Sequence, residues 1–365
     1  TFENLKSNIN ETENYIYINN KVKIKINNME KLNILFRKIK RAIIKRNQLY
    51  NQGFIWAILG TLLFSTKAIW IKLCFKTSTI DASSLLMLRM LFSLPFYAAA
   101  MWFFFQQQQI KKASRSTYIG ACLVGILGYY MSSLFDFIGL QYVSASIERI
   151  ILFIYPTLAV LLNLVLFKVA ISKRQWLAIF ITYIGIGLAY WGEWNQIPDT
   201  QSFVFGTWMI LLCAITYAFY LVGSGKLIPK IGAPQFTSLS MLAASLGIFI
   251  HYLVVHANDV TSVIQLPILH SSSLLYVIAL ALIATVIPSF LISGGMKRIG
   301  SNDLAIITSI GPVSTLFQAR WILGEPFSWE QIMGTLLVIV GVLLVKKVGA
   351  TKTNPDYPNY PSPKG

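Results

Sequence analysis

Five ionisable residues stand inside long apolar stretches of this sequence: Lys67, Arg89, Asp136, Glu148 and Arg149. Charged side chains are costly in a hydrocarbon environment, so such residues usually face one another or a water-filled cavity and mark a path for ions or polar solutes. The carboxylate of Glu148 could pair with a substrate amine or accept a coupling proton. The cations Lys67 and Arg89 could hold a carboxylate or a phosphate.

A structural role is the alternative for the same residues. The two carboxylates could pair with Arg89 or Arg149 in a self-neutralising network that locks helices together, and Arg89 could instead extend toward the membrane surface. Neighbouring side chains are about 100° apart around a helix. Glu148 and Arg149 therefore cannot both point straight at one cavity, and we expect one of them to brace the other.

Aromatic residues are abundant, and most of them suit packing or the membrane interface. Tyr130, Tyr155 and Tyr217 are the candidates for lining a cavity, a choice that rests on the family resemblance described below; there their rings could stack on a flat or apolar substrate and their hydroxyls could orient it. The sequence contains no nucleotide-binding or hydrolase motif and no Cys/His spacing typical of a metal site. We therefore expect no catalytic residues, no metal and no cofactor.

The elements that position these residues follow from composition. The 365 residues are 55% hydrophobic and 12% charged, with a mean hydropathy of +0.60, whereas soluble domains carry about 25% charged residues. Apolar runs of about 20 residues suit helices that cross a bilayer. We predict ten spans, all helical: 53–73, 82–105, 117–137, 145–167, 175–192, 203–225, 235–256, 274–295, 303–323 and 329–346.

The distribution of charge predicts how the chain threads the membrane. The net charge is +17, and residues 1–50 hold eleven Lys and Arg against four acidic residues. The remaining Lys and Arg cluster in alternate loops, so the positive-inside rule places both termini in the cytoplasm; Lys72 and Lys76 are the exceptions. This pattern favours contact with anionic lipid, with Arg37–Arg46 as a short surface helix, and argues against nucleic-acid binding.

The sequence also contains an internal repeat. Residues 139–187 align without a gap on residues 156 positions later, which matches Gly139 with Gly295, Pro156 with Pro312, and Gly185 with Gly341. Five spans per copy would make the second copy enter the membrane in the opposite sense, an arrangement that supports alternating access. The ion cluster belongs to the first copy alone, because Leu304 and Ala305 occupy the positions that match Glu148 and Arg149.

Three prolines interrupt the apolar stretches: Pro156, Pro288 and Pro312. Proline removes a backbone hydrogen bond and can bend a helix. Since two of the three match across the repeat, we expect paired bends that act as hinges or gates. Tolerated kinks without a role in movement are the alternative.

Several segments resemble the EamA-like members of the drug/metabolite transporter superfamily. The first copy contains Gly60-Thr-Leu-Leu-Phe-Ser-Thr-Lys-Ala-Ile-Trp-Ile-Lys72, Leu88-Arg89-Met90 and Ser144-Ala-Ser-Ile-Glu-Arg-Ile-Ile-Leu-Phe-Ile-Tyr-Pro156; the second contains Ile310-Gly-Pro312 and Leu323-Gly-Glu-Pro326. The resemblance implies a ten-helix fold of two inverted five-helix repeats, with spans 3, 4 and 6 around a cavity. It also implies export or uptake of small metabolites. One departure is Phe167-Lys-Val-Ala170, where the first copy lacks the Leu-Gly-Glu-Pro turn.

These observations define the expected organisation: a basic N-terminal segment (1–50), two five-helix repeats (51–192 and 203–347) and a C-terminal tail (348–365). We expect an all-α integral membrane protein of the inner membrane, a monomer or homodimer. It would be a gradient-driven secondary transporter of small polar or amphipathic metabolites, amino-acid-like or nucleoside-like, with a coupling proton or a counter-substrate. An intramembrane enzyme built on Asp136 and Glu148 is one alternative. A receptor or scaffold that works through the basic tail is another.

Overall fold

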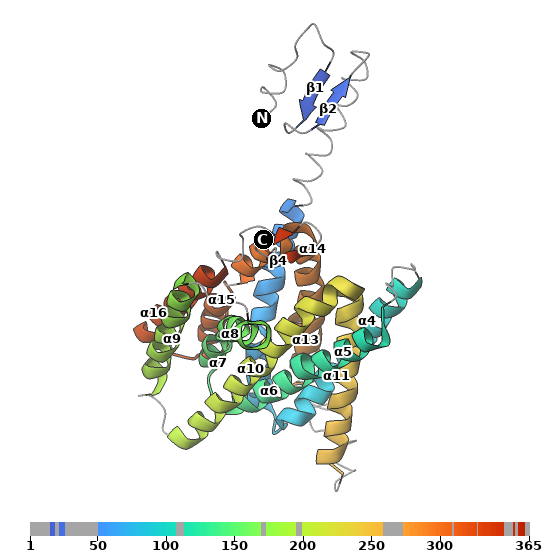
Figure 1. Ribbon diagram of the computed structural model, residues 1–365. Helices are drawn as coiled ribbons and strands as arrows, with labels where there is room; N and C mark the ends of the chain where they lie inside the picture. Colours follow the sequence, from blue (N-terminus) through green and yellow to red (C-terminus); the bar gives the residue numbers. More distant parts are fainter. Residues whose placement is uncertain are drawn as a thin grey trace.

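The computed structural model describes residues 15–18, 22–25, 50–106, 113–168, 173–194, 199–257, 273–308, 310–326, 328–346, 353–354 and 357–361. In these residues the chain is a bundle of helices, with short antiparallel hairpins in the two terminal segments (Figure 1). The surface helix predicted at Arg37–Arg46 lies outside these ranges.

The first repeat begins with a helical stretch over residues 50–65, which a turn at Thr66 separates from the next helix. The elements that follow are α3 (Lys67–Thr77), α4 (Ala82–Gln106), α5 (Arg115–Gly125), the π-helical segment η1 (Ile126–Met131), α6 (Ser132–Tyr142), α7 (Ala145–Leu152), α8 (Tyr155–Phe167) and α9 (Lys173–Trp194).

The second repeat comprises α10 (Thr200–Ile231), α11 (Ala233–Val255), α13 (Leu274–Ala281), the π-helical segment η3 (Leu282–Val286), α14 (Ile287–Thr308), α15 (Gly311–Gln318), the π-helical segment η4 (Ala319–Leu323) and α16 (Trp329–Lys346). The terminal hairpins pair β1 (Tyr15–Ile18) with β2 (Val22–Lys25), and β3 (Thr353–Asn354) with β4 (Tyr357–Pro361).

Eight helices in the described ranges are long and apolar enough to cross a membrane: Tyr50–Thr77, Ala82–Phe103, Arg115–Tyr142, Ala145–Leu166, Lys173–Gly192, Thr200–Ile231, Gln235–Val255 and Leu274–Ile292. A shorter apolar helix spans Trp329–Gly341. These nine coincide with nine of the ten predicted spans. The predicted span 303–323 is divided instead between the end of α14 and the α15–η4 unit, because the chain leaves the helix just before Gly311-Pro312.

The repeat found in the sequence is also present in the backbone. The segments η1 and η3 lie at matching positions under the same shift of 156 residues. The turn at Ile154 (φ −70°, ψ −20°) matches the turn at Ile310 (φ −71°, ψ −19°). Two helix ends match as well, because Lys168 and Gly324 both adopt a left-handed conformation with φ of 53° and 74°.

Pro156 and Pro312 occupy the beginnings of helices, whereas Pro288 lies within the continuous helical span Leu274–Ile292. Pro156 and Pro312 stand in the first turns of α8 and α15, immediately after the matched turns, where the missing N–H of proline breaks no hydrogen bond. Pro288 is the second residue of α14 and follows the π-helical segment η3. The spans around Pro156 and Pro312 are therefore each interrupted by a turn two residues before the proline, at Ile154 and Ile310.

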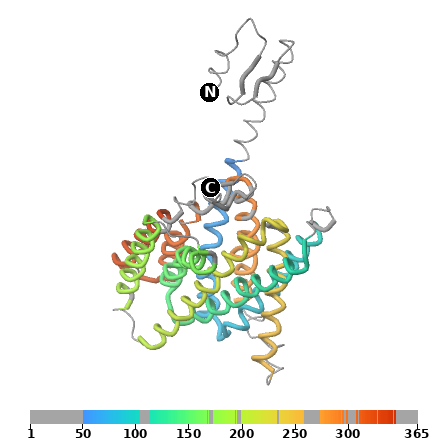
Figure 2. Tube along the Cα trace, in the orientation of Figure 1, coloured from blue at the N-terminus to red at the C-terminus, as the bar shows by residue number. Residues whose placement is uncertain are grey.

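The two repeats are interleaved around the first span. Figure 2 shows this span in blue between the green and red helices on one side and the cyan and yellow helices on the other. Helix α9 packs on α16 and α4 packs on α11, and each member of these pairs is the counterpart of its partner under the repeat. At Gly185, a β-carbon would lie 2.7 Å from the carbonyl oxygen of Gly334, so the α9–α16 contact requires glycine there.

Candidate functional site

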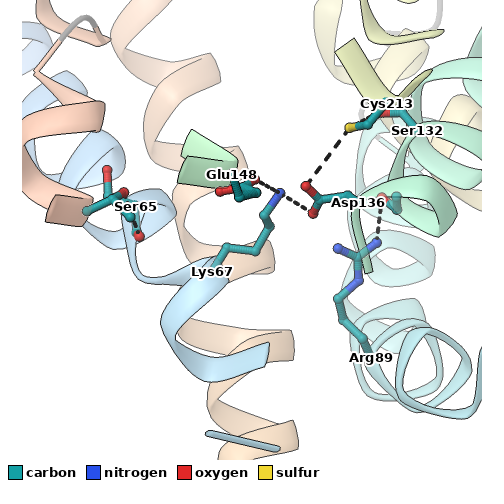
Figure 3. Close-up of polar contacts among 9 residues, drawn as sticks. Ser65, Lys67, Arg89, Ser132, Asp136, Glu148 and Cys213 are labelled. Atoms are coloured by element: carbon teal, nitrogen blue, oxygen red, sulfur yellow. Dashed lines mark hydrogen bonds and ion pairs between the residues drawn. The ribbon is translucent and has the colours of Figure 1, made fainter. Parts of the chain in front are cut away.

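Three of the predicted site residues form a buried ion cluster, which we call the Lys67 cluster: Lys67, Asp136 and Glu148. The ammonium of Lys67 lies 2.7 Å from Oδ2 of Asp136 and 3.7 Å from Oε1 of Glu148. Figure 3 shows the lysine side chain extended between the two carboxylates. The side chains of Asp136 and Glu148 are 1% and 0% exposed, so the Lys67 ammonium is the counter-ion of two carboxylates that solvent does not reach.

Local backbone structure places each member of the Lys67 cluster. Lys67 is the first residue of α3, directly after the turn at Thr66. Glu148 lies in the first turn of α7, whose N-terminus Ser144 caps by accepting a hydrogen bond from the Ile147 N–H. A carboxylate is favourable near a helix N-terminus. The cluster thus forms where the first and fourth predicted spans start new helices beside α6.

The second repeat also contacts this cluster. The thiol of Cys213 in α10 lies 4.0 Å from Oδ1 of Asp136 and 3.3 Å from the hydroxyl of Ser132. On the other side, the Ser65 hydroxyl donates to the Gly311 carbonyl (3.2 Å) and the Thr315 hydroxyl donates to the Ser65 carbonyl (3.1 Å). The first span is therefore held at its break by the start of α15.

Arg89 is buried beside the cluster without joining it. Its Nη2 donates to the hydroxyl of Ser133 at 3.0 Å, and its guanidinium carbon lies 4.8 Å from the centre of the Phe137 ring. The ion pairs of both carboxylates are with Lys67. Asp136 also interacts electrostatically with Arg89, and Glu148 with Arg149, over longer distances. Lys67 is therefore the central cation of the charged group.

Arg149 points to a different set of neighbours than Glu148 does. Its guanidinium carbon lies 5.3 Å from the centre of the Phe64 ring and 5.8 Å from that of Phe153. Gly311 adjoins the same group, since a β-carbon there would lie 2.9 Å from Nη2 of Arg149. Adjacent residues of α7 thus face two regions, as their angular separation requires.

The three predicted tyrosines divide into two locations. Tyr155 and Tyr217 meet edge to face with ring centres 4.9 Å apart, and Tyr217 stacks on Tyr220 at 5.5 Å. Tyr130 lies instead against His251 of α11, with ring centres 5.7 Å apart. Tyr129, which precedes Tyr130 in the sequence, contacts the group formed by Tyr155, Tyr217 and Tyr220. Its hydroxyl forms a hydrogen bond of 2.7 Å with the hydroxyl of Tyr220.

A carboxylate from the second repeat completes the start of α7. Glu325 accepts hydrogen bonds from the Ala145 N–H (3.0 Å), the Ser146 N–H (3.3 Å) and the Ser146 hydroxyl (3.0 Å). It belongs to the Leu-Gly-Glu-Pro segment, which the left-handed Gly324 introduces. The helix that carries Glu148 and Arg149 is therefore tied at its beginning to the turn before α16.

Sequence reasoning did not assign Phe64, Cys213, Gly311 or Glu325 to the site. Glu325 had a signal in the Leu-Gly-Glu-Pro motif, and Gly311 had one in its position before a matched proline. Phe64 and Cys213 resemble any other apolar residue of a span, and their contacts depend on packing between distant helices. Within the part of the chain that the structure describes, no group of three or more His, Cys, Asp or Glu residues is placed to hold a metal.

The sequence is similar to that of known membrane transporters. The model of the EamA-like transporter family matches residues 51–191 and 204–346. The uncharacterized transporter YcbK of Bacillus subtilis (strain 168) is 31% identical over 294 residues, covering 80% of this chain and 92% of the relative. The uncharacterized transporter YyaM of the same organism is 26% identical over 241 residues, covering 66% of this chain and 77% of the relative.

The fold also has a counterpart among solved structures. One crystal structure superposes with a TM-score of 0.51 at 16% sequence identity, covering 82% of this chain and 97% of that one. The apolar helices and the two matched segments define a multi-pass membrane transporter of small molecules rather than an enzyme. The chain belongs to the EamA-like transporter family, and it carries two copies of the family's domain.

Proposed function

We propose that the protein is a secondary transporter that uses a gradient to move small polar or amphipathic metabolites, amino-acid-like or nucleoside-like, across the inner (cytoplasmic) membrane. The observation that carries the proposal is the Lys67 cluster, in which three spans contribute buried charges that lipid alone would not stabilise. Two further buried cations, Arg89 and Arg149, accompany the cluster. The site therefore offers partners for both anionic and cationic groups of a substrate.

Alternating access is the mechanism that we propose for this site. The repeat, the interleaved pairs α4–α11 and α9–α16, and the matched turns before Pro156 and Pro312 support two halves related by a two-fold axis in the membrane plane. Ten spans in inverted repeats, with both termini in the cytoplasm, would then let the halves exchange shapes. The matched turns are the proposed hinges, with Pro288 beside η3 as a third.

Glu148 is the residue that we expect to respond to a coupling proton or to a substrate amine. Its carboxylate lies 1.0 Å further from the Lys67 ammonium than that of Asp136 does, at 3.7 Å against 2.7 Å. Protonation of Glu148 would leave the closer Lys67–Asp136 pair intact. The cluster can therefore change its charge by one proton without losing its shortest ion pair.

The test is transport by purified protein in liposomes supplied with a metabolite pool and a proton gradient, with uptake followed by mass spectrometry. We expect saturable accumulation of at least one compound, and slower accumulation by E148Q, because an amide can neither accept a coupling proton nor pair with a substrate amine. Glu330 is exposed at the start of α16, so E330Q is the matched control and should transport as the wild type does.

Two outcomes would count against the proposal. The absence of saturable uptake of any compound would remove the transport function, and normal uptake by E148Q with an unchanged unfolding temperature would remove Glu148 from the site.

For the N-terminal segment we make a separate proposal, that it attaches to anionic lipid. A chain lacking residues 1–45 that transports normally but binds anionic vesicles less tightly would support it.

A further inference from the structure

The buried ionisable residues carry more positive than negative charge. Three cations, Lys67, Arg89 and Arg149, accompany two carboxylates, Asp136 and Glu148, and every one of the five residues is at most 8% exposed. Fully ionised, the group has a net charge of +1. Lys67 engages both carboxylates, and among the residues that the structure describes neither guanidinium lies within 4.0 Å of a carboxylate oxygen. An unpaired buried charge is strongly destabilising.

The two guanidinium groups differ in the hydrogen bonds that they already make. Arg89 donates a hydrogen bond to Ser133. The guanidinium of Arg149 makes no hydrogen bond or ion pair with any described residue, and its Nε, like that of Arg89, is buried without a partner. Its neighbours are the rings of Phe64 and Phe153. Arg149 therefore has more free hydrogen-bonding capacity than Arg89, whose Nη2 is already engaged by Ser133.

The repeat shows that space is kept for this guanidinium. At the first residue of α8 the first repeat has Tyr155, and at the matching first residue of α15 the second repeat has Gly311. A β-carbon on Gly311 would lie 2.9 Å from Nη2 and 3.6 Å from Nε of Arg149. Helix α15 continues through η4 and begins at Gly311. The positive end of its helix dipole therefore also lies at Gly311.

We infer that Arg149 recognises the anionic group of the substrate, and that this substrate is a small monocarboxylate with an apolar body that lies against Tyr155 and Tyr217. The inference rests on the proposed transport function. A guanidinium presents a planar fork that matches a carboxylate bidentately, and Tyr155 and Tyr217 supply aromatic faces close to it along the chain of rings that begins at Phe153.

A guanidinium can bind either a carboxylate or a phosphate bidentately. The net charge of the buried group distinguishes between these two anions. A carboxylate carries one negative charge and brings the buried group from +1 to neutrality. A phosphate monoester carries about −1.5 to −2 at neutral pH and would overshoot. A free amino acid is a zwitterion and would leave the excess charge in place. Acids without a free amine, such as N-acyl amino acids and keto acids, fit the balance.

The experiment supplies wild-type proteoliposomes with a pool of matched compounds: N-acetyl amino acids, the corresponding N-acetyl amino acid amides, free amino acids, nucleosides and nucleoside monophosphates. Protein-free liposomes give the background for each compound. We expect N-acetyl amino acids to accumulate and their amides, which differ only in lacking the carboxylate, to stay near background. A charge-assisted bidentate pair contributes about 1.5–3 kcal/mol, so R149Q should raise the half-saturation concentration roughly 10- to 100-fold.

Two further variants separate recognition from folding. G311A keeps every charge but forces the guanidinium to move, and R149K keeps the charge but lacks the fork; both should raise the half-saturation concentration with little change in maximal rate. Lys76 is exposed at the end of α3, so K76Q removes a positive charge elsewhere and should behave as the wild type.

The inference is overturned if wild-type protein accumulates amides, nucleosides, nucleoside monophosphates or free amino acids in preference to monocarboxylates. It is also overturned if R149K and G311A keep half-saturation concentrations within about twofold of the wild-type value. If no compound accumulates at all, the transport function itself fails. That result is distinct from transport that ignores the carboxylate.

Discussion

At the scale of single residues, Lys67 is the cation that holds the site together. It lies within 4 Å of two buried carboxylates that have 1% and 0% of their side chains exposed. Removing one partner of a buried ion pair leaves an uncompensated charge, which is more destabilising than the pair itself is stabilising. The loss of Lys67 would leave two such charges on α6 and α7.

We therefore predict that K67M lowers the free energy of unfolding by roughly 3 kcal/mol, measured by titration of the detergent-solubilised protein with a denaturing detergent. The double variant K67M/D136N should recover part of this loss, because it removes one of the two orphaned carboxylates. A single variant as stable as the wild type, or a double variant less stable than K67M, would contradict this account of the cluster.

At the scale of elements, glycines decide how closely α9 and α16 approach. A β-carbon on Gly334 would collide with the carbonyl oxygen of Gly185 and lie 2.7 Å from the Ala189 side chain. Gly187, on the same helix as Gly185, has no atom within 4 Å of the position that a β-carbon would take. Gly185 and Gly187 of α9 thus have opposite requirements, although the sequence presents them as one small-residue stretch.

This difference predicts opposite signs for the same chemical change. G334A should lower the free energy of unfolding by about 1–3 kcal/mol, the usual cost of overpacking. G187A should raise it by up to about 1 kcal/mol, because alanine has the higher helix propensity and meets nothing. Thermal unfolding of both variants in the same detergent checks the pair, and equal shifts of one sign would show that the α9–α16 contact is not tight.

The matched helix ends give a second pair of expectations. Lys168 adopts φ of 53° where its counterpart Gly324 has φ of 74°, and a left-handed conformation costs a residue with a β-carbon about 1–2 kcal/mol. K168G should therefore raise the apparent unfolding temperature and G324A should lower it. K168A removes the same charge but keeps the β-carbon, so it should not stabilise. Stabilisation by K168A would assign the effect to charge instead.

These elements show what sequence patterns can and cannot predict. Nine of the ten spans follow from apolar runs, and the matched prolines predicted breaks near Pro156 and Pro312. The π-helical segments η1 and η3 were not predicted, because an inserted residue leaves no compositional signal. The contact of Glu325 with Ala145 joins residues 180 positions apart, and it depends on how whole helices pack.

At the scale of the whole molecule, the charged loops and the repeat lead to one expectation about orientation. Gln141 and Lys297 are related by the shift of 156 residues, at the ends of the third and eighth predicted spans. In parallel repeats these two positions would lie on the same side of the membrane. In inverted repeats they lie on opposite sides, and the positive-inside rule assigns Lys297 to the cytoplasm.

Cysteine labelling in intact cells distinguishes these arrangements. In a variant with Cys74, Cys122 and Cys213 replaced by alanine, a cysteine at position 141 should react with a membrane-impermeant maleimide added outside, and a cysteine at position 297 should react only after the cells are opened. Uptake by the cysteine-free parent shows that the fold is retained, and denatured samples show that each cysteine can be labelled. Labelling of both positions from one side would exclude inverted repeats. Alternating access would then lose its structural basis, because two halves in the same orientation cannot exchange inward-open and outward-open shapes about a two-fold axis in the membrane plane.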